Sequence, residues 1–248
     1  MSIRAIIFDL GHTLWDIGPH DEALARAYRD AHALICDRFG RADLPAPERL
    51  QAAVRDVLME SAETYFSNGP ELSQPPTHTF LAEGCRRLGL DLDEDVLREL
   101  TPPLFCTESE ALIVTEGTRD AIVALRNDGY ALGCITNTLA DGASIRRMLR
   151  SHGFEELLAS VVVSADERLR KPHAALFEKA ITELGAEPGE AVFVGDSPYH
   201  DIGGAKAVGM WAVLTHQYVA RPHDGFDPKP DAIIRHVSEL RTIVPRLG

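Results

Sequence analysis

Short apolar runs, each too brief for a helix, constrain the fold of this 248-residue chain more than any other feature. They do not alternate polar and apolar residues, which is typical of strands buried on both faces of a parallel sheet. The six runs are Ala5–Phe8, Tyr130–Ile135, Val161–Val163, Ala191–Val194, Trp211–Leu214 and Ala232–Ile234. Helical patterns separate them, one from Pro172 to Leu184 with Pro172 at the first helical position, and one from Thr118 to Gly129. The alternation from about residue 113 onward predicts a doubly wound α/β domain.

Residues 17–112 have a different pattern. This stretch holds no strand-like run, but several amphipathic runs with helical spacing, interrupted at Pro45, Gly69–Pro70 and Pro75–Pro76. The runs are Glu22–Phe39, Pro47–Tyr65, Thr77–Leu88 and Glu94–Leu100. We therefore predict an α/β core made of residues 1–16 and 113–248, with a second, smaller all-helical domain of residues 17–112 inserted after the first strand.

Composition narrows the classes of partner. Asp and Glu outnumber Lys and Arg by 38 to 25, so the net charge of −13 repels nucleic acid, and an anionic ligand would need local compensation. No run approaches the ~18 apolar residues of a membrane span, and the apolar start is too short for a signal peptide. The four cysteines form no C-x-x-C pair, so neither a disulfide framework nor a structural zinc site is expected. We predict a soluble cytoplasmic protein, monomer or homodimer, with no nucleic-acid or membrane partner.

Polar side chains follow four of the apolar runs in order. They are Asp9, Thr136 with Asn137, Lys171, and Asp196 with Asp201. The carboxyl ends of parallel strands meet at one edge of a sheet, so these groups are expected to converge there. The carboxylates, the hydroxyl and the ammonium in this set suit a phosphoryl group, because they can supply a nucleophile, ligands for magnesium and partners for phosphate oxygens.

Each of these residues alone has an ordinary structural explanation. An Asp after a strand often caps a helix, and Asp201 could be the N-cap of a helix through Ala205. Thr136 could be a satisfied strand-end hydroxyl, and Lys171 a solvated surface charge. Four such positions at four strand ends favour a common site.

The four motifs Asp9-x-x-x-Thr13-Leu14, Thr136-Asn137, Lys171-Pro172 and Gly195-Asp196-x4-Asp201 resemble those of the haloacid dehalogenase-like hydrolase superfamily. The resemblance covers the core from both ends, and the helical insert is similar to the cap of that superfamily. It implies a Rossmann-like core and a mobile cap that closes over small substrates. Most members with the Gly-Asp-x4-Asp element are magnesium-dependent phosphatases, so it also implies a phosphohydrolase that acts on a small phosphorylated metabolite.

The resemblance implies a role for each matching residue toward the substrate. Asp9 would attack phosphorus and form an aspartyl-phosphate intermediate. Thr136 and the backbone amide of Asn137 would hold the phosphoryl oxygens. Lys171 would neutralise the charges of the nucleophile and the phosphate.

The resemblance also implies a magnesium site. Asp9, Asp196 and the backbone carbonyl of Gly11 would bind the ion. Asp201 would lie behind them and orient Lys171 or a metal-bound water.

One position departs from the family pattern. The residue two after the nucleophile is normally an Asp that protonates the leaving oxygen, and here it is Gly11. The next residue, usually Gly, is His12. General acid–base catalysis is typically worth about 10² to 10⁴ in rate. His12 is the nearest replacement for the acid, with contact to substrate or packing as its other reading, and His20 is a further candidate.

Three other functions are consistent with part of the pattern. The missing acid allows a catalytically impaired relative that binds a phosphorylated ligand or a protein partner. Metal-free dehalogenases also lack an Asp at position 11, but they do not keep the Gly-Asp-x4-Asp element. Phosphonate hydrolases need a cap lysine, and this function is excluded because all four lysines of this chain lie between positions 171 and 229. Candidates for substrate selectivity are Trp15, Asp16, His20 and Tyr65.

Overall fold

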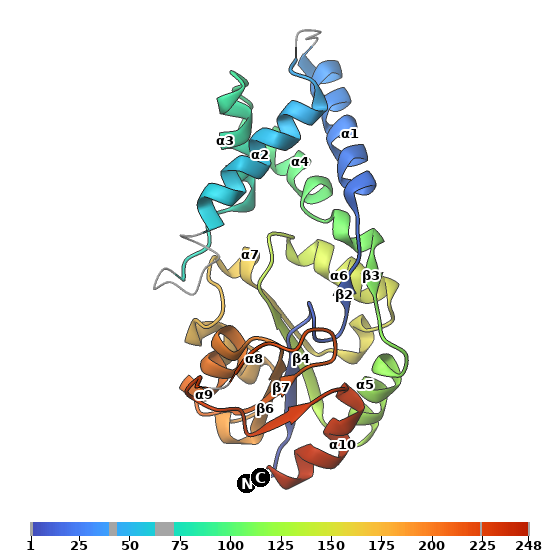
Figure 1. Cartoon of the computed structure of the whole chain (residues 1–248), viewed down its shortest axis with the longest axis vertical. Coiled ribbons are helices and arrows are strands. Elements are labelled where there is room, and N and C mark those ends of the chain that lie inside the picture. Colours follow the sequence, from blue (N-terminus) through green and yellow to red (C-terminus); the bar gives the residue numbers. More distant parts are fainter. Residues whose placement is uncertain (1, 40–43, 63–71, 224, 248) are drawn as a thin grey trace. The chain divides into compact units, whose positions relative to one another are not determined.

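The computed structural model describes residues 2–39, 44–62, 72–223 and 225–247, and the chain divides into two compact units (Figure 1). The first, here called the sheet unit, consists of Met1–Ile17 and Leu112–Gly248. The second, here called the helical unit, is Gly18–Ala111. These limits differ by one residue at each junction from the limits of the predicted insert. Tyr65 and the break at Gly69–Pro70 lie outside the described residues.

The sheet unit is built on a six-stranded sheet of order β5-β4-β1-β6-β7-β8 in which every pair is parallel. Its strands are β1 (Ala5–Phe8), β4 (Ala131–Thr136), β5 (Ser160–Val163), β6 (Ala191–Gly195), β7 (Trp211–Thr215) and β8 (Ala232–Ile234). All six predicted strands are therefore confirmed, with ends that move by at most one residue. β1 lies between β4 and β6, so it is buried on both faces and at both edges.

Helices cover both faces of this sheet, as an all-parallel sheet requires (Figure 1). They are α5 (Thr118–Asn127), α6 (Gly142–Ser151), α7 (Ser164–Glu167), α8 (Ala174–Glu183), α9 (Gly204–Ala207) and α10 (Leu240–Ile243). Phe177 of α8 meets Phe193 of β6 edge to face, with ring centroids 5.1 Å apart. Both rings are fully buried, and each such side chain stabilises the fold by roughly 1.5–3 kcal/mol.

Two helix predictions in this unit need correction. The helix expected to start at Pro172 starts at Ala174, because His173 is its N-cap and the His173 Nδ1 accepts a hydrogen bond of 3.2 Å from the Ala175 amide. Helix α6 was not predicted at all. Its start is fixed by Asp141, whose side chain accepts from the Ser144 amide at 2.7 Å.

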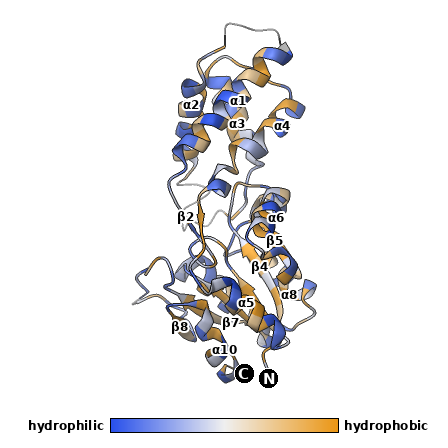
Figure 2. Cartoon of the chain, turned by 90° about the vertical axis from the view of Figure 1, so that its right-hand side faces the viewer, coloured by the Kyte–Doolittle hydropathy of each residue, from blue (hydrophilic) through white to orange (hydrophobic). Residues whose placement is uncertain are grey.

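The helical unit contains α1 (Asp21–Phe39), α2 (Pro47–Ser61), α3 (Thr77–Arg87), α4 (Glu94–Leu104) and a short 3₁₀ turn, η2 (Thr107–Glu110). In Figure 2, α1 and α2 mix polar and apolar residues along their length, whereas the strands of the sheet unit are largely apolar. This mixture is typical of helices that bury one face and expose the other. Helix α4 runs past the predicted end at Leu100 through two prolines, and both Leu100 and Leu104 are buried. Within the described residues, no helix is long and apolar enough to cross a membrane.

The two units are joined through a pair of two-residue strands that the sequence did not predict. β2 (Asp16–Ile17) and β3 (Leu112–Ile113) pair antiparallel, where the chain leaves the sheet unit and where it returns. Two residues are too few to show any alternation, so no sequence pattern could have revealed them.

Candidate active site

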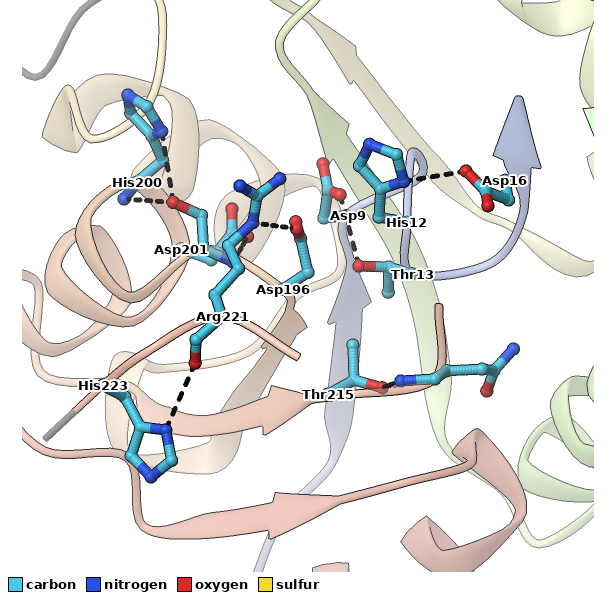
Figure 3. Close-up of polar contacts among 12 residues, drawn as sticks. Asp9, His12, Thr13, Asp16, Asp196, His200, Asp201, Thr215, Arg221 and His223 are labelled. Carbon is cyan, nitrogen blue, oxygen red and sulfur yellow. Dashed lines mark hydrogen bonds and ion pairs between the residues drawn. The ribbon is translucent and has the colours of Figure 1, made fainter. Parts of the chain in front are cut away.

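Asp9 lies directly after β1 at the carboxyl edge of the sheet. Its amide donates to the carbonyl of Val194 at 2.9 Å, which ties it to the end of β6. Its side chain is buried, and each oxygen has a partner: Oδ1 accepts from Lys171 Nζ at 2.6 Å, and Oδ2 accepts from Thr13 Oγ1 at 3.2 Å. The carboxylate therefore has a fixed direction at the centre of the edge (Figure 3).

Lys171 is a buried cation shared between two acids. Its Nζ donates to Asp9 Oδ1 at 2.6 Å and to Asp201 Oδ1 at 2.7 Å, and its side chain is only 2% exposed. Asn137 fixes the backbone of Lys171, since its Oδ1 accepts from the Lys171 amide at 2.8 Å and its Nδ2 donates to the Lys171 carbonyl at 3.2 Å. Burial by itself lowers the pKa of Lys171, but Asp201 and Asp9 outweigh it and raise this pKa above its usual value. Lys171 is therefore a permanent positive charge.

Asp201 lies in a π-helical turn, η5 (Pro198–Gly203), that follows β6. Its Oδ2 accepts from the Ser197 amide at 2.9 Å, while Oδ1 binds Lys171. A side chain at Gly195 would collide with this carboxylate, so the glycine of the Gly-Asp-x4-Asp element is what lets Asp201 approach the strand end. Asp201 is not the N-cap of this turn, because Ser197 fills that place.

Asp9, Asp196 and Asp201 form one buried acidic cluster, in which one oxygen from each lies within 4.8 Å of the others. Three carboxylates so close together are unstable without positive charge, and oxygen donors at this spacing fit a hard divalent cation such as magnesium. The donor set therefore suits the ion that the sequence implied.

Burial sets the proton affinities of this cluster. It raises the pKa of Asp9 to about 7, with Asp201 and Asp196 acting in the same direction and Lys171 opposing them. Burial and Asp201 also raise the pKa of Asp196, against the effect of Arg221. For both groups burial is the largest cause of the raised pKa, and the neighbouring carboxylates add to it.

Arg221 is a site residue that the sequence reasoning missed. It lies on the segment after β7, and its Nε donates to Asp196 Oδ2 at 2.5 Å (Figure 3). The two residues are 25 positions apart and belong to no common motif. The only available signal was position, since β7 ends at the same edge of the sheet as β6.

The Nδ1 of His12 lies within hydrogen-bond distance of Asp16 Oδ1, at 2.9 Å, and Asp16 Oδ1 also accepts from the Ile17 amide at 2.8 Å. The His12 backbone has φ +56°, in the left-handed region that a glycine would adopt more easily. The His12 side chain is partly exposed. At Gly11, a Cβ atom would meet nothing within 4 Å, so the loop has room for the carboxyl group that is missing there.

The remaining candidates lie in different environments. Thr136 ends β4 and is 5% exposed, but no hydrogen bond joins its hydroxyl to the acidic cluster among the described residues. Trp15 is buried, and its ring packs against that of Phe154 with centroids 6.2 Å apart, so its role in substrate selectivity stays a prediction. His20 belongs to the helical unit, where its Nδ1 contacts the Gly18 carbonyl at 3.1 Å.

Comparison with known proteins gives a consistent result. The family model for haloacid dehalogenase-like hydrolases matches residues 3–209. A glyceraldehyde 3-phosphate phosphatase of Pyrococcus furiosus is 38% identical over 213 residues, covering 85% of this chain and 80% of the relative. A protein of the same name from Methanopyrus kandleri is 29% identical over 250 residues and covers 99% of each chain. Among solved structures, a 2-haloacid dehalogenase from Pseudomonas syringae pv. Tomato DC3000 has a TM-score of 0.68 at 26% identity, covering 99% of this chain and 100% of that one.

Proposed function

Because this chain belongs to the haloacid dehalogenase-like hydrolases, and within them to the phosphatase type, we propose that it is a magnesium-dependent phosphohydrolase that acts on a small phosphorylated metabolite through an aspartyl-phosphate intermediate. The observation that carries the proposal is the contact of Asp9 with Lys171 inside the buried acidic cluster. A carboxylate held at a fixed direction by a permanent cation is suited to attack an electrophile that is itself anionic.

In the first step an oxygen of Asp9 attacks phosphorus, the bond from phosphorus to the ester oxygen breaks, and the alcohol leaves with a proton. Lys171 holds Asp9 Oδ1 and offsets the negative charge that gathers when a phosphate approaches a carboxylate. In the second step water attacks the phosphorus of the aspartyl-phosphate. The bond from phosphorus to the Asp9 oxygen breaks and Asp9 is released as a carboxylate. Inorganic phosphate takes up the oxygen of the water, and the protons of the water pass to the phosphate and to the group that protonated the alcohol.

Asp9, Asp196 and the carbonyl of Gly11 would hold magnesium in this scheme. When bound, the ion supplies positive charge that polarises the phosphoryl group. Asp201 takes the supporting position, because its two oxygens bind Lys171 and the Ser197 amide. It thereby orients the ammonium that Asp9 needs.

Thr136 and Asn137 complete the phosphate site. Thr136 is the last residue of β4, and in this proposal its hydroxyl donates a hydrogen bond to a phosphoryl oxygen. The side chain of Asn137 binds the backbone of Lys171, so Asn137 contributes to the phosphate through its backbone amide.

The proton for the leaving alcohol has no carboxyl source at Gly11. His12 is the nearest titratable side chain on the same loop, and Asp16 orients its ring through Nδ1, which leaves Nε2 for the substrate. We assign His12 to the substrate side of the site, with donation of this proton as the role to be tested.

Two further candidate functions each have one observation in their favour. The absence of a carboxyl group at Gly11 favours a protein that binds a phosphorylated ligand without turning it over. The similarity to a solved 2-haloacid dehalogenase favours attack by Asp9 on carbon with release of halide. Retention of Asp196 and Asp201 argues for the metal-dependent phosphatase over both.

The decisive experiment compares wild type, Asp9→Asn and Asp128→Asn on an aryl phosphate with magnesium. Asp128 is a matched control, because it is an acid of the same unit that lies outside the acidic cluster. Its carboxylate accepts a hydrogen bond of 2.7 Å from Arg241 Nε. Asp9→Asn should abolish turnover and Asp128→Asn should retain it. Chelator should stop the wild type, and added magnesium should restore it.

Acid quenching during turnover should trap a phosphoryl group on the wild type and none on Asp9→Asn. Asp196→Ala should weaken magnesium binding severely. Turnover by Asp9→Asn within tenfold of wild type would rule out Asp9 as the nucleophile. Activity that persists in chelator, with halide released from a haloacid, would establish the dehalogenase instead.

A further inference from the structure

Arg221 and Asp196 form an ion pair that the proposed chemistry does not use. The Arg221 Nε lies 2.5 Å from Asp196 Oδ2. The Asp196 side chain is only 7% exposed, whereas that of Arg221 is 43% exposed. Figure 3 shows the guanidinium reaching from the segment after β7 to the carboxylate at the end of β6. The acid is thus fixed and buried, and its partner comes from the solvent side.

The two cations of the site differ in how firmly they are held. Lys171 is buried, bonds two carboxylates, and has its backbone clamped by Asn137. Arg221 is bound to the cluster through Asp196 and is otherwise half exposed. An exposed arginine that gives up one ion pair regains water on its guanidinium, so Arg221 leaves the cluster at a far smaller cost in free energy than Lys171 would.

Asp196 is the acid for which a second cation competes. Its carboxylate is buried beside Asp9 and Asp201 and has the Arg221 guanidinium as its charged partner. Arg221 brings one charge to this carboxylate, while a magnesium ion brings two and also balances Asp9. A ligand oxygen that is already hydrogen-bonded to a guanidinium must give up that bond, or share its charge, when it binds the ion.

We propose that Arg221 is an internal counter-ion that holds Asp196 in the metal-free protein and must be displaced by magnesium, so that Arg221 sets the metal affinity. This inference rests on the proposed function for the assignment of Asp196 as a metal ligand. It assigns to a residue outside the four motifs a direct effect on metal binding. Arg221 could instead be a permanent partner that orients Asp196 for the metal. Removing Arg221 would then weaken magnesium binding rather than strengthen it, so a binding measurement separates the two roles.

The test is magnesium binding to the full chain, freed of metal by chelator and dialysis, for wild type, Arg221→Met and Arg4→Met. Methionine keeps an unbranched stem and removes the charge. Arg4 is the control because it also pairs with a carboxylate, Glu190 at 3.4 Å, but stands at the opposite end of β1. Isothermal titration with magnesium chloride gives the affinity without reference to activity. The midpoint of thermal unfolding with and without magnesium gives a second measure.

Arg221→Met should bind magnesium about tenfold more tightly than wild type, since one charged hydrogen bond no longer has to be broken. Its unfolding midpoint should also rise more on saturation with magnesium. Arg4→Met should match wild type in both. If circular dichroism shows that Arg221→Met is not folded, Arg221→Ala takes its place with the same expected result.

An affinity for magnesium that is equal to or weaker than that of wild type in the folded Arg221 variant overturns the inference and leaves the proposed function intact. Failure of wild type and both Arg221 variants to bind magnesium has a different meaning. It removes the magnesium site from the proposed function, and this inference with it. Asp196→Asn distinguishes these cases, since it should abolish the binding that wild type shows.

Discussion

The charges at the carboxyl edge of the sheet and the ion pairs of the helical unit are organised in opposite ways. In the sheet unit, Lys171 and Asp201 are 2% and 1% exposed and pair inside the protein. In the helical unit, Arg87 pairs with Glu60 at 2.7 Å, with 34% and 62% of their side chains exposed. Burying a charge costs several kcal/mol unless its partners are in place, whereas exposed pairs cost and contribute little. Burial of charge therefore distinguishes the cluster around Asp9 from the ion pairs on the surface of the helical unit.

The same contrast appears in sequence distance. Exposed pairs of the helical unit such as Arg98–Glu94 and Arg87–Glu83 lie one helical turn apart. The buried pair of Lys171 with Asp9 joins residues 162 positions apart. Local pairs follow from helix geometry alone, while the buried pair exists only once the sheet has formed.

The largest expected effect concerns Lys171. Lys171→Ala should lower kcat/KM by about 10³-fold or more, because the site loses the cation that holds Asp9 and faces the phosphate. Lys171→Arg should lose less, since it keeps the charge but not the compact ammonium. Steady-state kinetics on an aryl phosphate measures both. Lys179→Ala is the control, an exposed lysine that pairs with Glu167. Wild-type kinetics in both Lys171 variants would show that the buried lysine matters no more for turnover than an exposed one.

The substitution Gly11→Asp adds a charge to the site, because it introduces a carboxyl group close to the acidic cluster. Gly11→Asp should raise the rate on alkyl phosphates by about 10–100-fold and change aryl phosphates little, since only poor leaving groups need a proton. The structure leaves space for the new side chain. The measurement is single-turnover phosphorylation of Asp9 across esters of increasing leaving-group pKa.

Gly11→Asn is the matched control for that series, with the same shape and no acid. A wild-type rate that is already independent of leaving-group pKa would show that another acid is present. His12→Ala would then identify it, if the dependence becomes steep in that variant.

His200 should give a moderate effect on stability. Burial lowers its pKa to about 4, and its buried Nε2 has no hydrogen-bond partner among the described residues, so a proton there would be unpaired. The unfolded chain binds this proton near pH 6.5 and the folded protein does not. The stability contributed is therefore complete above pH 6.5 and is lost as the pH falls from 6.5 toward 4. Because the side chain is partly exposed, we expect about 1–2 kcal/mol.

Urea unfolding of wild type and His200→Asn between pH 4 and 8 measures this contribution. Asparagine cannot titrate but can keep the hydrogen bond to the Ser197 hydroxyl. The difference between the two curves should be constant above pH 7 and should shift in favour of the variant below pH 6.5. Parallel curves over the whole range would show that His200 titrates alike in both states.

The smallest expected effect is in the helical unit. A double-mutant cycle on Arg87→Ala and Glu60→Ala should give a coupling too small to resolve by chemical unfolding, despite the two hydrogen bonds of 2.8 and 2.7 Å between them. Phosphatase activity should be unchanged in all three variants. A coupling as large as that expected for a buried pair would contradict the rule that exposed ion pairs contribute little to stability.

The sequence predicted the strands well, because a buried parallel strand leaves an unbroken apolar run wherever it occurs. It also predicted which residues follow the strand ends. It did not reveal Arg221, β2 or β3, since these depend on contacts between segments that share no local pattern. The start of α8 was misjudged because proline suits the first helical turn in general, and only the structure shows that His173 accepts the capping hydrogen bond.

The central place of β1 has a consequence for the order in which the chain can fold during synthesis. Ala5 pairs with Ala131 on one side and with Ala191 on the other. At roughly 5–20 residues per second, β1 leaves the ribosome some ten to forty seconds before its second neighbour exists. In that interval the helical unit can form from contacts among α1 to α4, while β1 first has no partner strand and then pairs with β4 on one edge only. Asp9 is thus made among the first residues, and its surroundings are completed only when β6 arrives.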